Sequence, residues 1–286
     1  MNSPDWIPDF FELNNAFDFA IKEDIGDGDH SALSCLNHTK RGKAKLLIKQ
    51  DGIIAGIALA KYLFTYIDST ATVEVLIEDG SKVYPGDIAL TVEANAIKLL
   101  QAERLVLNYT QRLSGVATSS AEYANMVAHT STTILDTRKT TPGLRVLEKW
   151  AVSLGGGGNH RMGLYDMIML KDNHIDFAGG IIPAVNSVRE YLSARGKTLK
   201  IEVETRDLNE VQEALIAGVD RIMLDNFTTK ETRTAVALID HRAETESSGG
   251  ITKDTLVSYA ECGVDYISVG ALTHQIKSID MSLKAL

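Results

Sequence analysis

The feature that most constrains the fold of this chain is a repeated alternation of short strand-like segments and helical patterns from residue 132 onward. Strands that alternate with helices form a parallel sheet, because each helix carries the chain back to the same end of the sheet. The nearly uniform length of these units favours an α/β barrel over an open doubly wound sheet. The predicted strands are Thr133–Thr137, Met167–Lys171, Lys200–Glu204, Arg221–Asp225, Thr245–Ser248 and Tyr266–Gly270.

The clearest helical pattern in this part covers residues 142–154, where apolar side chains recur three and four positions apart. Thr141 is expected to cap this helix, Pro142 to occupy its first turn and Gly155 to end it.

The first 110 residues have a different pattern, which predicts a small α+β domain with a sheet. Ile57–Ile67 has helical spacing between strand-like segments, and two further helical stretches run across the boundary between the two parts. The predicted strands are Lys43–Gln50, Ala71–Ile77 and Asp87–Glu93, and the two boundary helices are Ala96–Leu107 and Leu113–Ala128.

Composition places the chain among soluble globular proteins, with 44% hydrophobic and 23% charged residues. The net charge of −9 argues against non-specific binding to nucleic acid, which depends on basic surface. The longest apolar run, residues 53–60, is far shorter than the roughly 20 residues that span a bilayer. We therefore expect neither a nucleic acid nor a membrane partner.

Two further features bear on the cellular compartment. The N-terminal residues lack a basic segment followed by an apolar run, so no secretory signal is expected. Cys35 and Cys262 are too few for a disulfide framework and form no zinc motif. A reducing cytoplasm is the expected location.

Polar or charged residues follow nearly every predicted strand of the second part. In an α/β barrel the carboxyl ends of the strands face one mouth, where active sites are built. Polar residues also occur where a strand simply leaves the core, but that explanation accounts for one or two strands and not for six. The segments expected to converge are Asp136–Lys139, Lys171–Asn173, Glu202–Glu204, Asp225–Asn226, Ser248–Gly250 and Gly270.

Two kinds of charge are expected at this mouth. Several cations that lie close together imply a polyanionic ligand; these are Arg138, Lys139, His160, Arg161 and Lys171. Glu204 and Asp225 are paired carboxylates of the kind that hold Mg²⁺ beside a phosphate, or they form salt bridges to Lys171 or Arg138. Glycine-rich segments at 248–250 and 269–271 can present backbone N–H groups to phosphate.

These residues belong to longer motifs. The most distinctive are Leu-Asp-Thr-Arg-Lys-Thr-Thr-Pro-Gly-Leu-Arg (135–145), Gly-Gly-Gly-Asn-His-Arg-Met-Gly-Leu-Tyr-Asp (156–166) and Leu-Lys-Asp-Asn-His-Ile (170–175). Shorter matches follow at residues 201–204, 223–226, 248–251 and 270–274, and others precede them at 101–104, 107–108 and 113–118. In this order they closely resemble the quinolinate phosphoribosyltransferase family, whose members are also called carboxylating nicotinate-nucleotide pyrophosphorylases.

The resemblance implies a transferase of de novo NAD biosynthesis. Its substrates would be quinolinate and phosphoribosyl pyrophosphate, and its products nicotinate mononucleotide, pyrophosphate and carbon dioxide. It also implies an incomplete, TIM-like α/β barrel with an N-terminal α+β open-faced sandwich domain. The expected domains are residues 1–112 for the sandwich and 113–273 for the barrel, with residues 274–286 returning to the first domain.

The resemblance also implies a role for each candidate residue. The expected quinolinate site consists of Arg138, His160, Arg161 and Lys171, with Lys139 between it and the donor and Thr140 as a further substrate contact. The 5′-phosphate would lie against Ser248, Gly249, Gly250, Val269, Gly270 and Ala271. Glu204 and Asp225 would engage the ribose hydroxyls and Mg²⁺, directly or through water. Lys139, Lys171, Glu204 and Asp225 are the expected catalytic residues. Arg104 would reach into a neighbouring subunit, making the enzyme a homodimer or a higher even oligomer.

Other readings stay open at this stage. They are a relative from the molybdenum-transport branch of the superfamily, a nicotinate phosphoribosyltransferase, a non-catalytic protein that binds a phosphorylated metabolite, and an aldolase with Lys171 as Schiff-base nucleophile.

Overall fold

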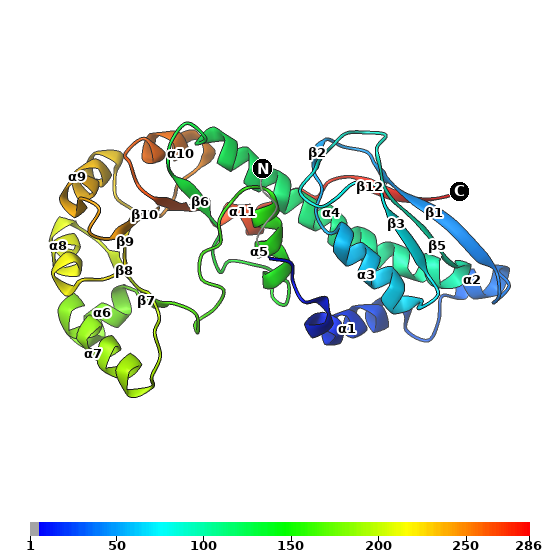
Figure 1. Ribbon diagram of the computed structural model, residues 1–286, viewed down its shortest axis with the longest axis horizontal. Coiled ribbons are helices and arrows are strands. Elements are labelled where there is room, and N and C mark those ends of the chain that lie inside the picture. Colours follow the sequence, from blue (N-terminus) through cyan, green and yellow to red (C-terminus); the bar gives the residue numbers. More distant parts are fainter. Residues whose placement is uncertain (1–5) are drawn as a thin grey trace. The chain divides into compact units, whose positions relative to one another are not determined.

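The computed structural model describes residues 6–286, which form two compact units (Figure 1). The first unit contains the described residues up to Ala121, Thr140–Gly156 and Leu272–Leu286, and the second contains Glu122–Lys139 and Gly157–Ala271. This division assigns residues 113–121 and 140–156 to the first unit, whereas the sequence analysis placed them in the barrel domain. The first five residues, which entered the expectation of no secretory signal, lie outside the described part of the chain.

A four-stranded antiparallel sheet forms the centre of the first unit. Its strand order is β12 (Met281–Ala285), β1 (Arg41–Ile48), β5 (Ile88–Asn95) and β3 (Thr72–Val75). A short ribbon of β2 (Gly52–Ile53) and β4 (Lys82–Val83) accompanies it. Because β12 pairs with β1, the last residues of the chain complete the sheet that the first hundred residues begin.

One face of this sheet is covered. Ala44, Leu46 and Ile48 alternate along β1 and are buried, whereas Lys43 on the opposite face is exposed. The helix α3 (Ile57–Ile67) packs against β3 and β5, and Asp79 accepts hydrogen bonds from its first two N–H groups. The remaining helical elements of this part are η1 (Phe10–Leu13), α1 (Asn14–Ile25), α2 (His30–Cys35), α4 (Ala96–Met126) and α5 (Arg145–Leu154).

The second unit contains a six-stranded parallel sheet with the order β6, β11, β10, β9, β8, β7. Within the described residues, β6 and β7 are the edge strands and do not pair with one another, so the barrel is incomplete, as predicted. The strands are β6 (Thr133–Leu135), β7 (Ile168–Leu170), β8 (Ile201–Thr205), β9 (Arg221–Asp225), β10 (Glu244–Ser248) and β11 (Tyr266–Ser268).

Helices lie on the outer side of this curved sheet (Figure 1). Side chains next to the first turn cap the N-termini of two of these helices: Asp207 caps α8, and Thr228 and Glu231 form a capping box on α9. The helices are α6 (Asp172–Ala178), α7 (Ile181–Ala194), α8 (Leu208–Ala217), α9 (Thr229–Ile239) and α10 (Lys253–Ala260), and a short α11 (Ala271–His274) follows β11.

The predicted start of one helix is wrong. α5 begins at Arg145 and not at Pro142, and Leu144 rather than Thr141 is its N-cap residue. The reason is Gly143, whose φ of +80° cannot continue a right-handed helix. The other end is confirmed, because α5 stops at Leu154 with Gly155 as its C-cap.

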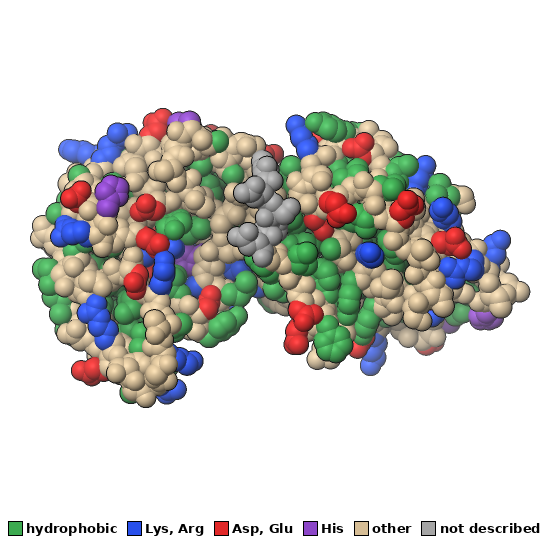
Figure 2. Space-filling view, viewed as in Figure 1, with side chains coloured by type: hydrophobic (Ala, Val, Ile, Leu, Met, Phe, Trp, Pro, Cys, Tyr) green, Lys and Arg blue, Asp and Glu red, His purple; other side chains and the backbone are tan. Residues whose placement is uncertain are grey.

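Charged side chains of both signs are interspersed over the face of the molecule drawn in Figure 2, and no single basic field covers it. Among the helices of the described residues, none combines the length and the apolar character that crossing a bilayer requires.

Candidate active site

The carboxyl ends of the parallel strands in the second unit meet at one edge of the sheet. Ser248 pairs in register with Asp225, Leu224 with Thr205, and Val203 with Leu170. Lys171 and Glu204, which follow Leu170 and Val203 along the chain, therefore lie at the same edge as Asp225 and Ser248. This is the edge at which α/β barrels hold their active sites.

Lys171 and Glu204 form an ion pair across the ends of β7 and β8. The Lys171 Nζ lies 2.6 Å from Glu204 Oε2. The Lys171 side chain is 48% exposed, whereas that of Glu204 is 11% exposed. The salt bridge that the sequence analysis kept as an alternative for Glu204 is thus present, and its lysine is accessible from outside.

Asp225 is oriented by the residue that follows it. Asn226 has a φ of +57°, and its Nδ2 donates to Asp225 Oδ2 at 2.6 Å. The backbone N–H of Asn226 donates to Ser248 O at 2.9 Å, which connects the end of β9 to the end of β10. A Cβ atom on Gly249 would collide with the Asn226 side chain, so only glycine fits there. Glu204 and Asp225 carry carboxylate oxygens, the kind of atom that Mg²⁺ prefers as a ligand.

Arg161 and Arg138 lie close enough to interact electrostatically. Burial lowers the pKa of the Arg161 guanidinium, and the positive charge of Arg138 lowers it further, against the opposing attraction of Glu202. Arg161 Nη1 donates to Met167 O at 3.1 Å. Two neighbouring guanidinium groups attract an anion such as a carboxylate, which each can bind through two parallel hydrogen bonds.

His160 is buried beside them. Its backbone N–H donates to Asp136 Oδ1 at 2.9 Å, and its Nδ1 accepts the backbone N–H of Arg161 at 2.7 Å. Gly158, two positions before His160, approaches β6. Its N–H donates to Ile134 O, and a Cβ atom at this position would collide with Leu135.

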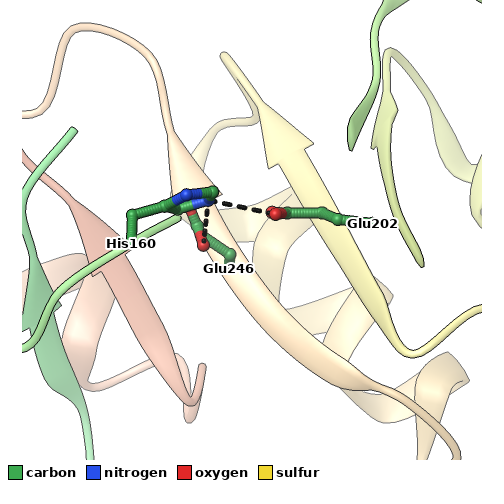
Figure 3. A group of neighbouring side chains, drawn as sticks. All are labelled: His160, Glu202 and Glu246. Atoms are coloured by element: carbon green, nitrogen blue, oxygen red, sulfur yellow. Dashed lines mark ion pairs between the residues drawn. The ribbon is translucent and has the colours of Figure 1, made fainter. Parts of the chain in front are cut away.

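Two buried carboxylates face the His160 ring, as Figure 3 shows. Glu202 and Glu246 are both fully buried, and burial raises the pKa of each to about 7. Arg221 opposes this rise, since its Nη1 donates to Glu246 Oε2 at 3.0 Å. Arg221 also lies over the ring of Tyr266, with its Cζ 4.0 Å from the ring centroid.

The candidate phosphate loop follows β10. Gly249 and Gly250 have φ values of +92° and +62°, which other residues rarely adopt, and α10 begins three residues later at Lys253. Turns of this kind expose backbone N–H groups next to a helix N-terminus. In the second candidate segment, the Val269 N–H donates to Leu135 O at 2.9 Å, so its amide is already used by β6.

Comparison with known proteins decides the family. Family models for the N-terminal and C-terminal domains of quinolinate phosphoribosyl transferase match residues 29–114 and 116–284. The chain belongs to the quinolinate phosphoribosyltransferase family.

Relatives from plants and bacteria support this assignment. "Quinolinate phosphoribosyltransferase [decarboxylating] 1b" of Nicotiana tabacum is 44% identical over 96% of this chain and 82% of its own length. "Probable nicotinate-nucleotide pyrophosphorylase [carboxylating]" of Bacillus subtilis is 41% identical over 95% of this chain and 93% of its own. The solved structure of NadC from Streptococcus pyogenes superposes with a TM-score of 0.92 at 37% identity, over 98% of this chain and 99% of that one.

Two candidate residues of this quinolinate phosphoribosyltransferase family member lie in the first unit. Arg104 is exposed on α4. Thr140 accepts a hydrogen bond from Arg145 Nε at 3.0 Å. Arg138, Lys139, His160, Arg161, Lys171, Glu204, Asp225 and the loop residues 248–250 and 269–271 belong to the second unit.

The sequence analysis gave no role to Arg221 and Glu246. It included Asp136 and Glu202 only as members of segments expected to converge at the mouth, without a role for either residue. All four are buried in the second unit. A signal was present in the spacing, because Glu202 and Glu246 each lie two positions before a predicted site residue, Glu204 and Ser248. Residues two apart in a strand point to the same side of the sheet, so a second layer of charge beneath the site could have been predicted.

Proposed function

We propose that this protein is a quinolinate phosphoribosyltransferase that forms nicotinate mononucleotide, pyrophosphate and carbon dioxide from quinolinate and phosphoribosyl pyrophosphate, in de novo NAD biosynthesis. The observation that carries the proposal is the neighbouring pair of guanidinium groups, Arg138 and Arg161, in the same unit as the strand-end carboxylates Glu204 and Asp225. Quinolinate has two carboxylates that suit the arginines, and the donor has phosphates and a ribose that suit the strand-end edge.

The proposed site residues form two groups, one that binds quinolinate and one that binds the phosphoribosyl donor. Arg138, Arg161 and Lys171 would hold the quinolinate carboxylates, and His160 lies next to Arg161 in the chain. The loop from Ser248 to Gly250 would hold the 5′-phosphate through backbone N–H groups. In the segment from Val269 to Ala271, the N–H groups of Gly270 and Ala271 would do so, because that of Val269 donates to Leu135 O. Lys139 would lie between the substrates, with Thr140 as a further contact.

In the reaction, the lone pair of the quinolinate nitrogen attacks the anomeric carbon while the bond to pyrophosphate breaks. The bond between the ring and the adjacent carboxylate then breaks, and its electron pair stays on the ring carbon, which takes up a proton as carbon dioxide leaves. Glu204 and Asp225 favour the positive charge that develops on the ribose, and the lysines favour the leaving pyrophosphate.

Glu204 and Asp225 also fit Mg²⁺, since they place partly buried carboxylate oxygens at the ends of the adjacent strands β8 and β9. They would hold the ion directly or through water, and the ion would supply charge neutralisation for the pyrophosphate oxygens.

We further propose a homodimer or a higher even oligomer in which Arg104 is donated to the partner's site. Support comes from the exposure of Arg104 on α4. Coexpression of an Arg104→Ala chain with a Lys171→Ala chain tests this, because a mixed dimer would regain one intact site and hence activity. Failure to regain activity in verified mixed dimers would reject the donation. A cytoplasmic location is proposed from the two free thiols, Cys35 and Cys262.

The function is tested by one assay that follows carbon dioxide and nicotinate mononucleotide together in the presence of Mg²⁺. Equal amounts of both products are expected, and none with nicotinate in place of quinolinate. If neither product forms with correctly assembled protein, the proposed reaction is wrong.

A further inference from the structure

The buried group of His160, Glu202 and Glu246 lies within the second unit, beneath the strand ends (Figure 3). The His160 Nε2 lies 3.0 Å from Glu202 Oε2 and 3.5 Å from Glu246 Oε2. The side chains of both carboxylates are fully buried, and that of His160 is 5% exposed. The ring therefore directs Nε2 toward the interior of the unit, among carboxylates.

The other ring nitrogen fixes the protonation state. Nδ1 accepts the backbone N–H of Arg161, so it carries a lone pair and no proton. In the neutral ring the proton must then reside on Nε2, where it faces the two carboxylates. An Nε2 that carries a proton has no lone pair for a metal ion, and Arg221 already donates to the Glu246 oxygen. The arrangement is thus suited to holding an N–H group and not a cation.

This state of His160 determines the geometry of the neighbouring backbone. Asp136 accepts the His160 N–H through Oδ1 and the Asn159 side chain through Oδ2, at 2.9 and 2.7 Å. With the bond from the Arg161 N–H to His160 Nδ1, these contacts hold residues 159–161 on both sides of the ring. Arg161 is thereby held at its backbone, and its guanidinium is held by Met167 O.

We propose that His160 is a positioning residue: the nearby oxygens of Glu202 and Glu246 favour the Nε2–H tautomer of its ring, and its Nδ1 fixes the backbone from which Arg161 reaches the carboxylates of the substrate. This rests on the proposed function for the identity of the substrate. It differs from the direct substrate contact implied by the family resemblance, because both ring nitrogens face protein atoms.

Two substitutions separate positioning from direct contact. Asn at this position retains an oxygen where Nδ1 lies and can still accept the Arg161 N–H. Gln places its amide where Nε2 lies and cannot. We expect His160→Asn to keep the KM for quinolinate within about twofold of the wild type. We expect His160→Gln to raise that KM about 3- to 10-fold, as the loss of one hydrogen bond predicts, with a smaller change in kcat.

The exposed His129 provides a matched control, and His129→Gln should leave both constants unchanged. The reverse order of the two His160 variants, with Gln active and Asn impaired, would show that the position of Nε2 matters and the bond at Nδ1 does not, and would overturn the proposal.

A measurement on the unaltered protein keeps the test decisive if either variant fails to fold. Nitrogen-15 NMR of the histidine rings should show His160 with a proton on Nε2 and none on Nδ1, before and after addition of quinolinate. A proton on Nδ1, or a change of tautomer when quinolinate binds, would reject the proposal. The tautomer is read without turnover, so this result stands apart from the assay of the proposed function.

Discussion

The Nζ of Lys171 lies 2.6 Å from Oε2 of Glu204, so the ends of the neighbouring strands β7 and β8 carry an ion pair with an exposed lysine. A second lysine–glutamate pair, Lys200 with Glu244, lies at the opposite ends of the strands with a separation of 2.9 Å. A lysine–glutamate ion pair therefore occurs at the carboxyl ends of the strands and another at their amino ends. Only the carboxyl ends form the candidate active site.

This symmetry allows a matched comparison. Lys171→Ala should lower kcat/KM by at least about 100-fold, because it removes a positive charge from the proposed site for two anionic substrates. Its effect on the free energy of unfolding should be about 0–1 kcal/mol, since exposed pairs contribute little. Lys200→Ala should change stability by a similar amount and leave the activity intact. Steady-state kinetics and urea unfolding of both variants provide the measurement; equal activities would contradict the assignment of the site.

Arg161→Ala should weaken quinolinate binding specifically. The loss of hydrogen bonds to a charged group costs roughly 1.5–3 kcal/mol, which corresponds to about a 10- to 150-fold rise in the KM for quinolinate. The KM for phosphoribosyl pyrophosphate should change little. Arg138→Ala should raise the KM for quinolinate in the same way, because its guanidinium lies close enough to that of Arg161 to interact with it electrostatically. An unchanged affinity for quinolinate in both variants would reject their role.

Glu204→Ala combined with Asp225→Ala should abolish the dependence of turnover on Mg²⁺, together with most of the turnover itself. The two carboxylates lie near the ends of β8 and β9, where they would supply the oxygen ligands for the ion. Titration of activity with MgCl₂ measures the effect, and thermal unfolding verifies the fold. Normal turnover with a normal response to Mg²⁺ would exclude both residues as metal ligands.

Glu246→Gln should alter how stability depends on pH. Burial raises the pKa of Glu246 from 4.5 to about 7 in the folded protein, so the folded state holds a proton that the unfolded chain has lost across this range. The contribution of Glu246 to stability is therefore greatest below pH 4.5, the pKa in the unfolded chain. It is lost as the pH rises toward about 7, the pKa in the folded protein. Glutamine cannot ionise, so the variant should lose less stability between about pH 4.5 and 7. Thermal unfolding of the wild type and the variant at several pH values across this range measures the difference. The exposed Glu213→Gln should follow the wild type, and identical profiles for all three proteins would contradict the prediction.

Arg112→Ala should strongly destabilise the first unit. Arg112 Nε donates to Glu148 Oε1 at 2.8 Å, and Glu148 is fully buried. Removal of one partner from a buried pair leaves an uncompensated charge, at a cost of about 3–5 kcal/mol. Arg41→Ala, which breaks an exposed pair with Glu93, should cost about 0–1 kcal/mol. Urea unfolding measures the loss of unfolding free energy in both variants. Similar losses would show that the burial of Glu148 does not make its ion pair more important than the exposed one.

The sequence by itself determined the parallel architecture and the end of the sheet at which the candidate site lies. Alternating strands and helices require a parallel sheet, and parallel strands bring residues as distant as Lys171 and Ser248 to one edge whatever the details of packing. Local rules also fixed Ile57–Ile67 and the end of α5 at Leu154, because helix spacing and a terminal glycine act over a few residues.

Tertiary structure decided what lies beneath that edge. The spacing of Glu202 and Glu246 places both on one side of the sheet, but their partners follow from the fold. The register of β8 and β9 sets Glu202 beside Arg221, and the chain after β6 brings His160 to both carboxylates. Burial then sets their pKa values, because the charged form loses its water and depends on the neighbours that the fold supplies. The start of α5 was likewise decided by the φ of Gly143, which sequence spacing does not report. The direction of the His160 ring also followed from contacts between residues far apart in the chain.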